Sequence, residues 1–378
     1  MMPFNLHLQA QGQTCQFRLT WGQGQSIAVV IDYPTEVFQQ YETWQTAYLQ
    51  YYRSFRARAG VSGIAKLPQI GWRSKLIQSE AGLLNTFQLW LNQAALLPIR
   101  VEITTSLRDE TTDLFITCES PEFDRLPWET WPNSPESPGT FRIARTPTII
   151  RSPIGKRIVR SQLRILVILG DETGLNFQAE RDALKALQRY AAVEFVGWQG
   201  KEDGTLRSRI RAAIMDEQGW DVLVFAGHSN ETALTGGELE IAPGESLMLA
   251  EILSDLRLAI DRGLQFEIFN SCRGLSIAQT IHKQVSQQFL LQFLQPFIIG
   301  SDVDAAMRSA CDTLQRDPNL DYPSSYWIPS LFRHPVSELL QFPLIDRLRW
   351  LKQWKPDRWE ASVVGSVAIL SLLNPGSS

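Results

Sequence analysis

Two reactive side chains, His228 and Cys272, lie 44 positions apart, and each follows a short apolar run. The first run is Asp221–Ser229 (DVLVFAGHS) and the second is Phe266–Gly274 (FEIFNSCRG). Each run is bounded by polar residues, a pattern typical of a buried strand. Groups at the carboxyl ends of neighbouring parallel strands converge on one crevice. A histidine and a cysteine delivered to such a crevice form an activated thiol nucleophile.

The chemistry of this pair requires only that the two side chains reach each other. A neutral thiol is a poor nucleophile at pH 7, whereas a nearby imidazole lowers the thiol pKa and later donates a proton to a leaving amine. Two simpler interpretations exist, because His228 can be a histidine in a turn and Cys272 a buried, inert thiol. The position of both residues directly after a buried run favours the catalytic pair.

The composition sets the class of protein. The chain has 378 residues, 44% hydrophobic and 20% charged, which are globular values. This length predicts two domains, or one domain with a sizeable extension. A net charge of −4 without a basic run argues against a nucleic-acid partner. The four cysteines show no CxxC spacing, so we expect neither a zinc site nor a redox pair. No signal peptide is evident at the start, and we therefore expect a reducing, cytoplasmic location.

The first part of the chain predicts an α+β domain over residues 1–158. Residues 4–31 alternate apolar and polar with glycines between the runs, as in an antiparallel meander. Periodic apolar residues then predict two helices. The expected helices are Thr35–Arg58 and Ser74–Leu96, and the expected later strands are Ile99–Thr104, Leu114–Cys118 and Phe141–Arg151.

Residues 159–335 alternate strand-like and helix-like segments. This order predicts a mostly parallel sheet with helices on both faces. Besides the two runs described above, the expected strands are Ile165–Leu169, Val193–Val196, the short Leu239–Ile241 and a final Tyr326–Phe332, and the expected helices are Asn176–Tyr190, Thr205–Asp216, Leu249–Asp261, Val285–Phe297 and Val303–Gln315.

The tail, residues 336–378, is basic and aromatic and ends in the uncharged run Ala361–Leu373. This run is too short for a spanning helix, which needs about 20 apolar residues. We favour a terminal helix that packs on the protein or frays. The alternative is the stub of a membrane anchor, because basic residues flank the run.

Two segments carry a resemblance to a known family. Phe225–Ser229 (FAGHS) and Asn270–Leu275 (NSCRGL) resemble the CHAT family of caspase-like cysteine peptidases. Leu126–Glu129 (LPWE) also resembles the region before the catalytic part of these proteins, although for Trp128 itself we favour a role in anchoring a loop to the core. The resemblance covers roughly Leu163–Pro335.

The resemblance implies an α/β fold with a caspase-like, mostly parallel sheet, and a cysteine endopeptidase that cleaves a protein or peptide substrate. It implies Cys272 as the nucleophile and His228 as general base and acid. It also implies that the backbone N–H groups of Ser229 and Cys272 stabilise the oxyanion. No metal or organic cofactor is required for this chemistry.

Asp171 and Glu172 follow the strand Ile165–Leu169. In this family, residues at the end of the first strand help to line the pocket for the side chain before the scissile bond. An acidic pocket selects Lys or Arg. The interpretation that we favour is that both carboxylates cap the helix that follows.

One segment departs from the family pattern. Relatives have a further strand after the cysteine-bearing strand, whereas Ser276–Phe289 contains no strand-like run. This departure predicts weak or absent peptidase activity. The alternative function is a catalytically weak or inactive interaction or signalling module whose N-terminal domain binds a regulatory protein. A third possibility, a redox sensor, needs a resolving thiol, for which Cys311 is the candidate.

Overall fold

The chain begins with the antiparallel meander that the sequence predicts. Its strands are β1 (Phe4–Gln11), β2 (Thr14–Trp21) and β3 (Gln25–Asp32). Every second residue of β1 and β2 is buried, from Phe4 to Leu8 and from Cys15 to Leu19, so one face of the meander forms a core. Gly22 and Gly24 lie at the β2–β3 turn with φ of +56° and +99°. These backbone angles favour glycine.

The structure is a computed structural model. It describes residues 3–59, 71–105, 112–133, 141–146, 160, 162–171, 178–189, 191–198, 200, 205–230, 237–271, 283–316, 323–333 and 340–341. The expectations for Glu172, for Cys272 and for the tail from residue 342 therefore concern positions outside the described residues.

Two later strands complete the first sheet, whose order is β3-β2-β1-β4-β5. β4 (Thr112–Cys118) pairs parallel with β1, and β5 (Phe141–Arg145) pairs parallel with β4. The first sheet is thus mixed, and the three-stranded meander is only part of it.

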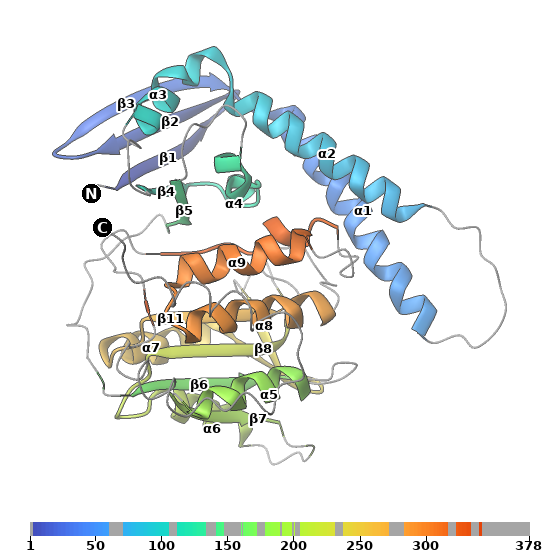
Figure 1. Cartoon of the computed structure of the whole chain (residues 1–378), viewed down its shortest axis with the longest axis vertical. Helices are drawn as coiled ribbons and strands as arrows, with labels where there is room; N and C mark the ends of the chain where they lie inside the picture. Colours follow the sequence, from blue (N-terminus) through green and yellow to red (C-terminus); the bar gives the residue numbers. More distant parts are fainter. Residues whose placement is uncertain are drawn as a thin grey trace, which may run out of the picture. The chain divides into compact units, whose positions relative to one another are not determined.

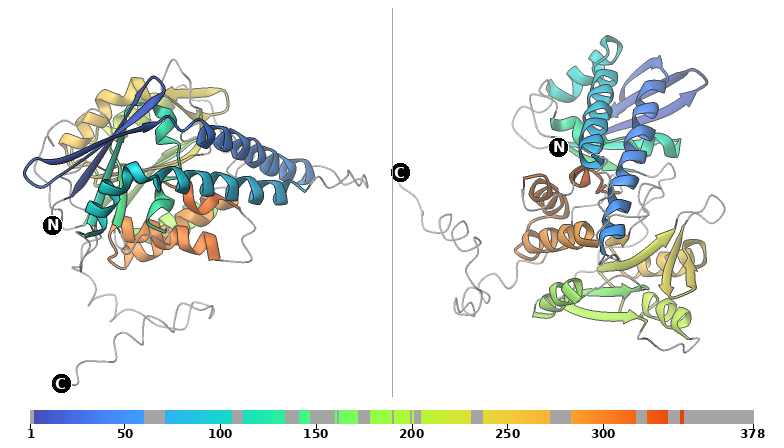
Figure 2. Two further views of the ribbon diagram at one scale, coloured as in Figure 1. Left: turned by 90° about the horizontal axis from the view of Figure 1, so that it is seen from above. Right: turned by 90° about the vertical axis from the view of Figure 1, so that its right-hand side faces the viewer.

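Two long helices form a hairpin (Figures 1 and 2). They are α1 (Thr35–Ala59) and α2 (Trp72–Leu91), and large side chains at helical spacing fill the core between them and the sheet. α2 ends at Leu91, earlier than predicted. The chain then continues as η1 (Ala94–Leu96) and α3 (Leu97–Thr105).

The predicted strand Ile99–Thr104 is wrong, since these residues lie in α3. Ile99 and Ile103 are buried while Val101 is exposed, which is helical spacing. The error arose because β-branched residues dominate this segment, and their strand propensity is only a weak guide. α4 (Pro121–Asp124) and η2 (Trp128–Asn133) then lead to β5.

The second sheet has six strands, and four of them are parallel in the order β7-β6-β8-β11. These are β6 (Leu163–Leu169), β7 (Ala191–Gly197), β8 (Val222–Asn230) and β11 (Phe266–Ser271). β9 (Glu238–Ala242) and β10 (Glu245–Met248) form an antiparallel extension beyond the end of β8. The protein therefore has a mixed α/β fold.

Helices cover both faces of the second sheet (Figure 2). On one face lie α5 (Gln178–Ala186) with η3 (Leu187–Arg189), α8 (Lys283–Ile298) and α9 (Val303–Arg316). On the other lie α6 (Leu206–Ile214) and α7 (Leu249–Asp261), which salt bridges Arg207–Glu251 and Arg211–Asp255 join to each other. The predicted helices agree with these to within a few residues.

The predicted final strand Tyr326–Phe332 is also wrong as a member of the second sheet. Residues Ser325–Trp327 form the turn η5, and the Trp327 indole N–H donates to Glu80 on α2 at 3.2 Å. Phe332 makes an isolated bridge with Arg145 at the outer edge of the first sheet. The apolar pattern of this segment reflects burial, but it does not specify which sheet the segment joins.

Candidate active site at the ends of β8 and β11

β8 is the central strand of the candidate site. β6 pairs with it on one side through Leu169↔Ala226, and β11 pairs with it on the other through Ser271↔Gly227. β11 and β8 are therefore adjacent and parallel, as expected for the two runs that carry Cys272 and His228. The next residue after the last pair is His228 on one strand and Cys272 on the other.

The structure differs from the expectation for His228. β8 does not stop before this residue but continues through Ser229 to Asn230, and His228 pairs with Glu240 in an antiparallel ladder with β9. Ser229, an expected oxyanion donor, is opposite Leu239 in the same ladder. Cys272, the other expected donor and the expected nucleophile, lies outside the described residues, as do the side chains of His228 and Ser229.

Asp171 lies at the same end of the sheet. It directly follows β6 and Gly170, it is 6% exposed, and its backbone N–H donates to the Glu240 carbonyl oxygen at 2.8 Å. The described part of the helix α5 begins at Gln178, and residues 172–177 lie outside the described residues, so the helix-capping interpretation of Asp171 stays a prediction. Its position beside the β8–β9 hairpin agrees with the alternative, a place near the expected site.

Two glycines allow the strands to approach closely at this end. Gly170 and Gly227 directly precede Asp171 and His228. A Cβ at Gly227 would lie 2.8 Å from Phe225 Cζ and 3.0 Å from Gly170 Cα, and a Cβ at Gly170 would collide with the Glu240 carbonyl oxygen. Neither glycine was predicted to matter, although a glycine directly before each polar strand end indicates close backbone approach.

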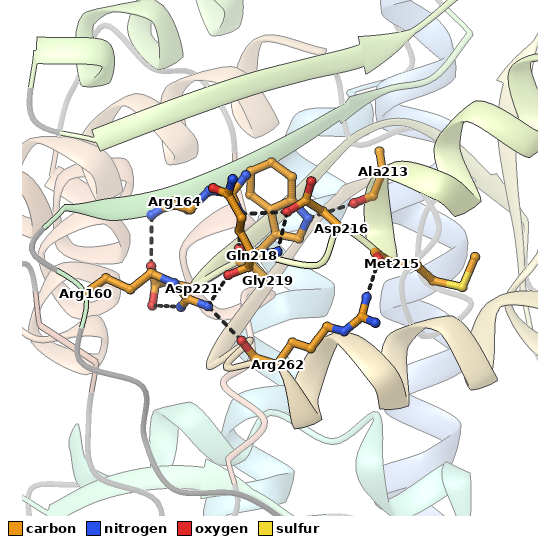
Figure 3. Close-up of polar contacts among 10 residues, drawn as sticks. Arg160, Arg164, Ala213, Met215, Asp216, Gln218, Gly219, Asp221 and Arg262 are labelled. Atoms are coloured by element: carbon orange, nitrogen blue, oxygen red, sulfur yellow. Dashed lines mark hydrogen bonds and ion pairs between the residues drawn. The ribbon is translucent and has the colours of Figure 1, made fainter.

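The opposite end of the sheet is fixed by a buried charge network (Figure 3). The Asp221 carboxylate, which directly precedes β8, accepts from Arg160 Nη1 at 2.8 Å and from the Arg164 backbone N–H of β6 at 2.9 Å. It also accepts from the Gln265 amide, directly before β11, at 3.2 Å. One carboxylate thus joins the starts of three parallel strands and fixes their register.

A second ion pair supports this end of the sheet. Arg164 stacks on Trp220, with Cζ 4.2 Å from the ring centre, and donates to Asp216 at 2.8 Å. This hydrogen bond holds the pKa of Asp216 below its usual value. Because these groups lie at the amino ends of the strands, away from His228, we interpret the network as structural.

The described cysteines are not activated. Burial raises the pKa of the Cys15 thiol to about 12, and it also raises the thiol pKa of Cys118 and of Cys311. All three are free thiols that stay protonated at neutral pH. A thiol of this kind is a poor resolving group, so Cys311 gives no support to the redox-sensor hypothesis.

The LPWE segment has a structural role at Trp128. The Trp128 side chain is fully buried, and its indole N–H donates to the Phe123 carbonyl at 2.7 Å. Glu129 pairs with the buried Arg145 of β5 at 2.6 Å. The expectation that Trp128 anchors a loop against the core is confirmed.

Comparisons with known proteins add no assignment, because no protein-family model matches the chain and a search of curated proteins finds no match. Within the described part of the chain, no group of three or more His, Cys, Asp or Glu side chains is placed to bind a metal ion. Among the helices of the same described residues, none is long and apolar enough to cross a membrane.

Proposed function

We propose that the protein is a cysteine endopeptidase of the CHAT, caspase-like type, with Cys272 and His228 as its catalytic pair. The observation that supports this most directly is the register of β8 and β11. Neighbouring strands lie about 4.8 Å apart. A register that continues by one residue beyond Ser271↔Gly227 brings positions 272 and 228 side by side.

The alternation of side chains supports the same pairing. Val224 and Ala226 of β8 belong to the core cluster on the α5–α8 face, and Phe266 and Ile268 of β11 pack against that cluster. Even-numbered positions of both strands thus lie on one face. Positions 228 and 272 continue this series.

The reaction follows from these two groups. The Cys272 thiolate attacks the carbonyl carbon of the scissile peptide, and the backbone N–H groups of Ser229 and Cys272 stabilise the oxyanion. The His228 imidazolium gives its proton to the departing amine as the C–N bond breaks, which leaves a thioester. A water molecule, deprotonated by His228, then attacks the thioester carbon and releases the acid and the thiolate. Asp171 and Glu172 supply the negative charge of a pocket for a Lys or Arg side chain.

The test compares wild type with Cys272→Ala on a peptide library and a set of protein substrates. We expect cleavage after basic residues by wild type and none by the variant. Alkylation by iodoacetamide across pH 5 to 9 gives a second measurement that needs no substrate. Cys272 should react fastest at neutral pH, because the described cysteines are held protonated. Equal reactivity of Cys15 and Cys272 in the folded protein would refute the pair.

One observation favours the second candidate, a weak or inactive interaction module with a regulatory protein partner. β11 pairs with β8 along one edge, and no strand among the described residues pairs with its other edge. An edge strand holds its last residue less firmly than a central one. A Cys272 thiol without a lowered pKa, together with capture of a partner by the N-terminal part, would support this candidate.

A further inference from the structure

The β8–β9 hairpin places a carboxylate opposite the expected catalytic histidine. The ladder pairs His228↔Glu240, Ser229↔Leu239 and Asn230↔Glu238. In an antiparallel pair, directly opposed residues share a face of the sheet and have Cβ atoms about 4.5–5.5 Å apart. Position 240 is therefore a direct neighbour of position 228.

The face on which Glu240 lies follows from its own strand. Leu239 and Ile241 are buried in the core cluster formed with α6 and α7. Alternation puts Glu240 on the other face, where α5 and α8 pack. This is also the face of Ala226, and hence of position 228.

The edge of β8 at which Glu240 lies follows from the backbone of Asp171. Asp171 directly follows β6, and its N–H donates to the Glu240 carbonyl at 2.8 Å, so β9 continues along the side of β8 where β6 ends. β11 pairs with the opposite side of β8. Glu240 thus lies on the side of β8 opposite to β11, whose last residue, Ser271, pairs with Gly227 directly before His228.

We infer that Glu240 is the positioning residue of the catalytic pair: it binds the His228 imidazole on the side away from Cys272. This inference rests on the proposed function. A carboxylate beside one ring nitrogen accepts its N–H, which fixes the tautomer and orients the other nitrogen toward the thiol. It also stabilises the imidazolium that forms when the thiol ionises. Glu240 is half-buried, so its charge is screened less than that of an exposed carboxylate.

The chain offers a matched control on the same strand. Glu238 has the same charge and also lies on β9, but it is opposite Asn230. Glu238 and Glu240 lie two residues apart on the same face of β9, so they differ in the residue they pair with but not in the face they occupy. Glu240→Gln and Glu238→Gln therefore remove one charge each from neighbouring positions, and only the first removes the group opposite His228.

The experiment measures alkylation of Cys272 by iodoacetamide against pH in the full chain, with the modified peptide quantified by mass spectrometry. For Glu240→Gln we expect the rate at pH 6 to fall about tenfold, which corresponds to a rise of about one unit in the midpoint of the profile. Glu238→Gln should give the wild-type profile. Where turnover is measurable, Glu240→Gln should lower kcat about 10–100-fold with little change in KM, as removal of groups that orient a functional histidine does. Glu240→Asp should restore part of the loss.

His228→Ala is a further control, which distinguishes a failure of the Cys272–His228 pair from a failure of the role of Glu240. If His228→Ala leaves the alkylation profile of Cys272 unchanged, the catalytic pair itself is wrong. If His228→Ala shifts the profile but Glu240→Gln and Glu238→Gln behave alike, the pair stands and the role of Glu240 is refuted. Slow alkylation of the buried Cys15 in each variant verifies that the fold is retained.

Discussion

Gly227→Ala is the substitution that most directly probes how the sheet positions His228. Gly227 lies between β6 and β11 and directly precedes the histidine. No positive φ requires glycine there, so the backbone itself accepts alanine. The effect depends only on the space available to one methyl group.

The loss of stability expected for Gly227→Ala follows from the contacts of the added methyl group. The added Cβ would lie 2.8 Å from Phe225 Cζ and 3.0 Å from Gly170 Cα, whereas ordinary contacts begin at 3.4 Å. Relief requires shifts of about 0.6 Å for the ring and about 0.4 Å for the β6 backbone. Overpacking of this kind costs about 1–3 kcal/mol. The lower entropy of alanine in the unfolded chain returns roughly 0.5–1 kcal/mol, so the net effect is destabilising.

The shift also moves the backbone beside His228. A misplacement of 1 Å can lower a rate by about 100-fold, so a shift of half that size should lower kcat by about tenfold. Urea unfolding gives the free energy of unfolding, and alkylation of Cys272 at pH 6 gives the state of the pair. The free energy of unfolding and the rate of Cys272 alkylation should both be lower in Gly227→Ala than in wild type.

Two further variants make the test specific. Gly82→Ala on α2 meets only the flexible Gln40 side chain at 3.0 Å and should stabilise the protein by up to about 1 kcal/mol, because alanine favours a helix. Phe225→Leu removes the Cζ atom, so the cost of Gly227→Ala should shrink in the double variant by about 0.5 kcal/mol or more. Wild-type stability of Gly227→Ala would refute the close approach of β6 and β8.

Three other predictions concern stability. Burial raises the pKa of Glu267 on β11, so the folded state carries an unfavourable charge above that pKa; Glu267→Gln should raise the melting temperature at pH 7, and the gain should vanish below about pH 4, where the unfolded carboxyl is also protonated. Asp221→Ala should lower the free energy of unfolding by about 3–5 kcal/mol by leaving the Arg160 charge without its carboxylate, measured in urea with Asp221→Asn as the milder control. Deletion of residues 360–378 should leave the melting temperature almost unchanged, and a large drop would mean that the segment is part of a core. In a separate flotation assay the full chain should not bind liposomes; binding would favour the anchor.

The periodic elements of the second sheet could be predicted because their burial pattern is uniform. β6 and β8 read as apolar runs since both faces of a central parallel strand are covered, and α7 was predicted with its observed bounds, Leu249–Asp261. The parallel pairing of β8 with β11, the two runs that precede His228 and Cys272 in the sequence, was likewise predicted. Local pattern and tertiary packing agree in these elements.

The errors fall where the local pattern does not decide the partner. Ile99 and Ile103 satisfy a helix as well as a strand, and helical packing prevailed. The buried Trp327 donates a hydrogen bond to Glu80, a contact between positions far apart in the chain. The hairpin partner of His228 could not be predicted either, because register with β9 depends on the turn and on the Asp171–Glu240 hydrogen bond rather than on composition.

The two ends of the second sheet have different roles, so a substitution at one end can change stability without changing activity, and the reverse. At the amino ends, Asp221 holds three strands in register through charge-assisted bonds. At the carboxyl ends, Gly170 and Gly227 leave room for backbones to approach, and Asp171 and His228 directly follow these glycines. A parallel sheet transmits register along its whole length, because a slip at one end would move every pair at the other. Substitutions at Asp221 should therefore lower stability before they alter the pH profile of Cys272, whereas Glu240→Gln should alter that profile with little change in stability.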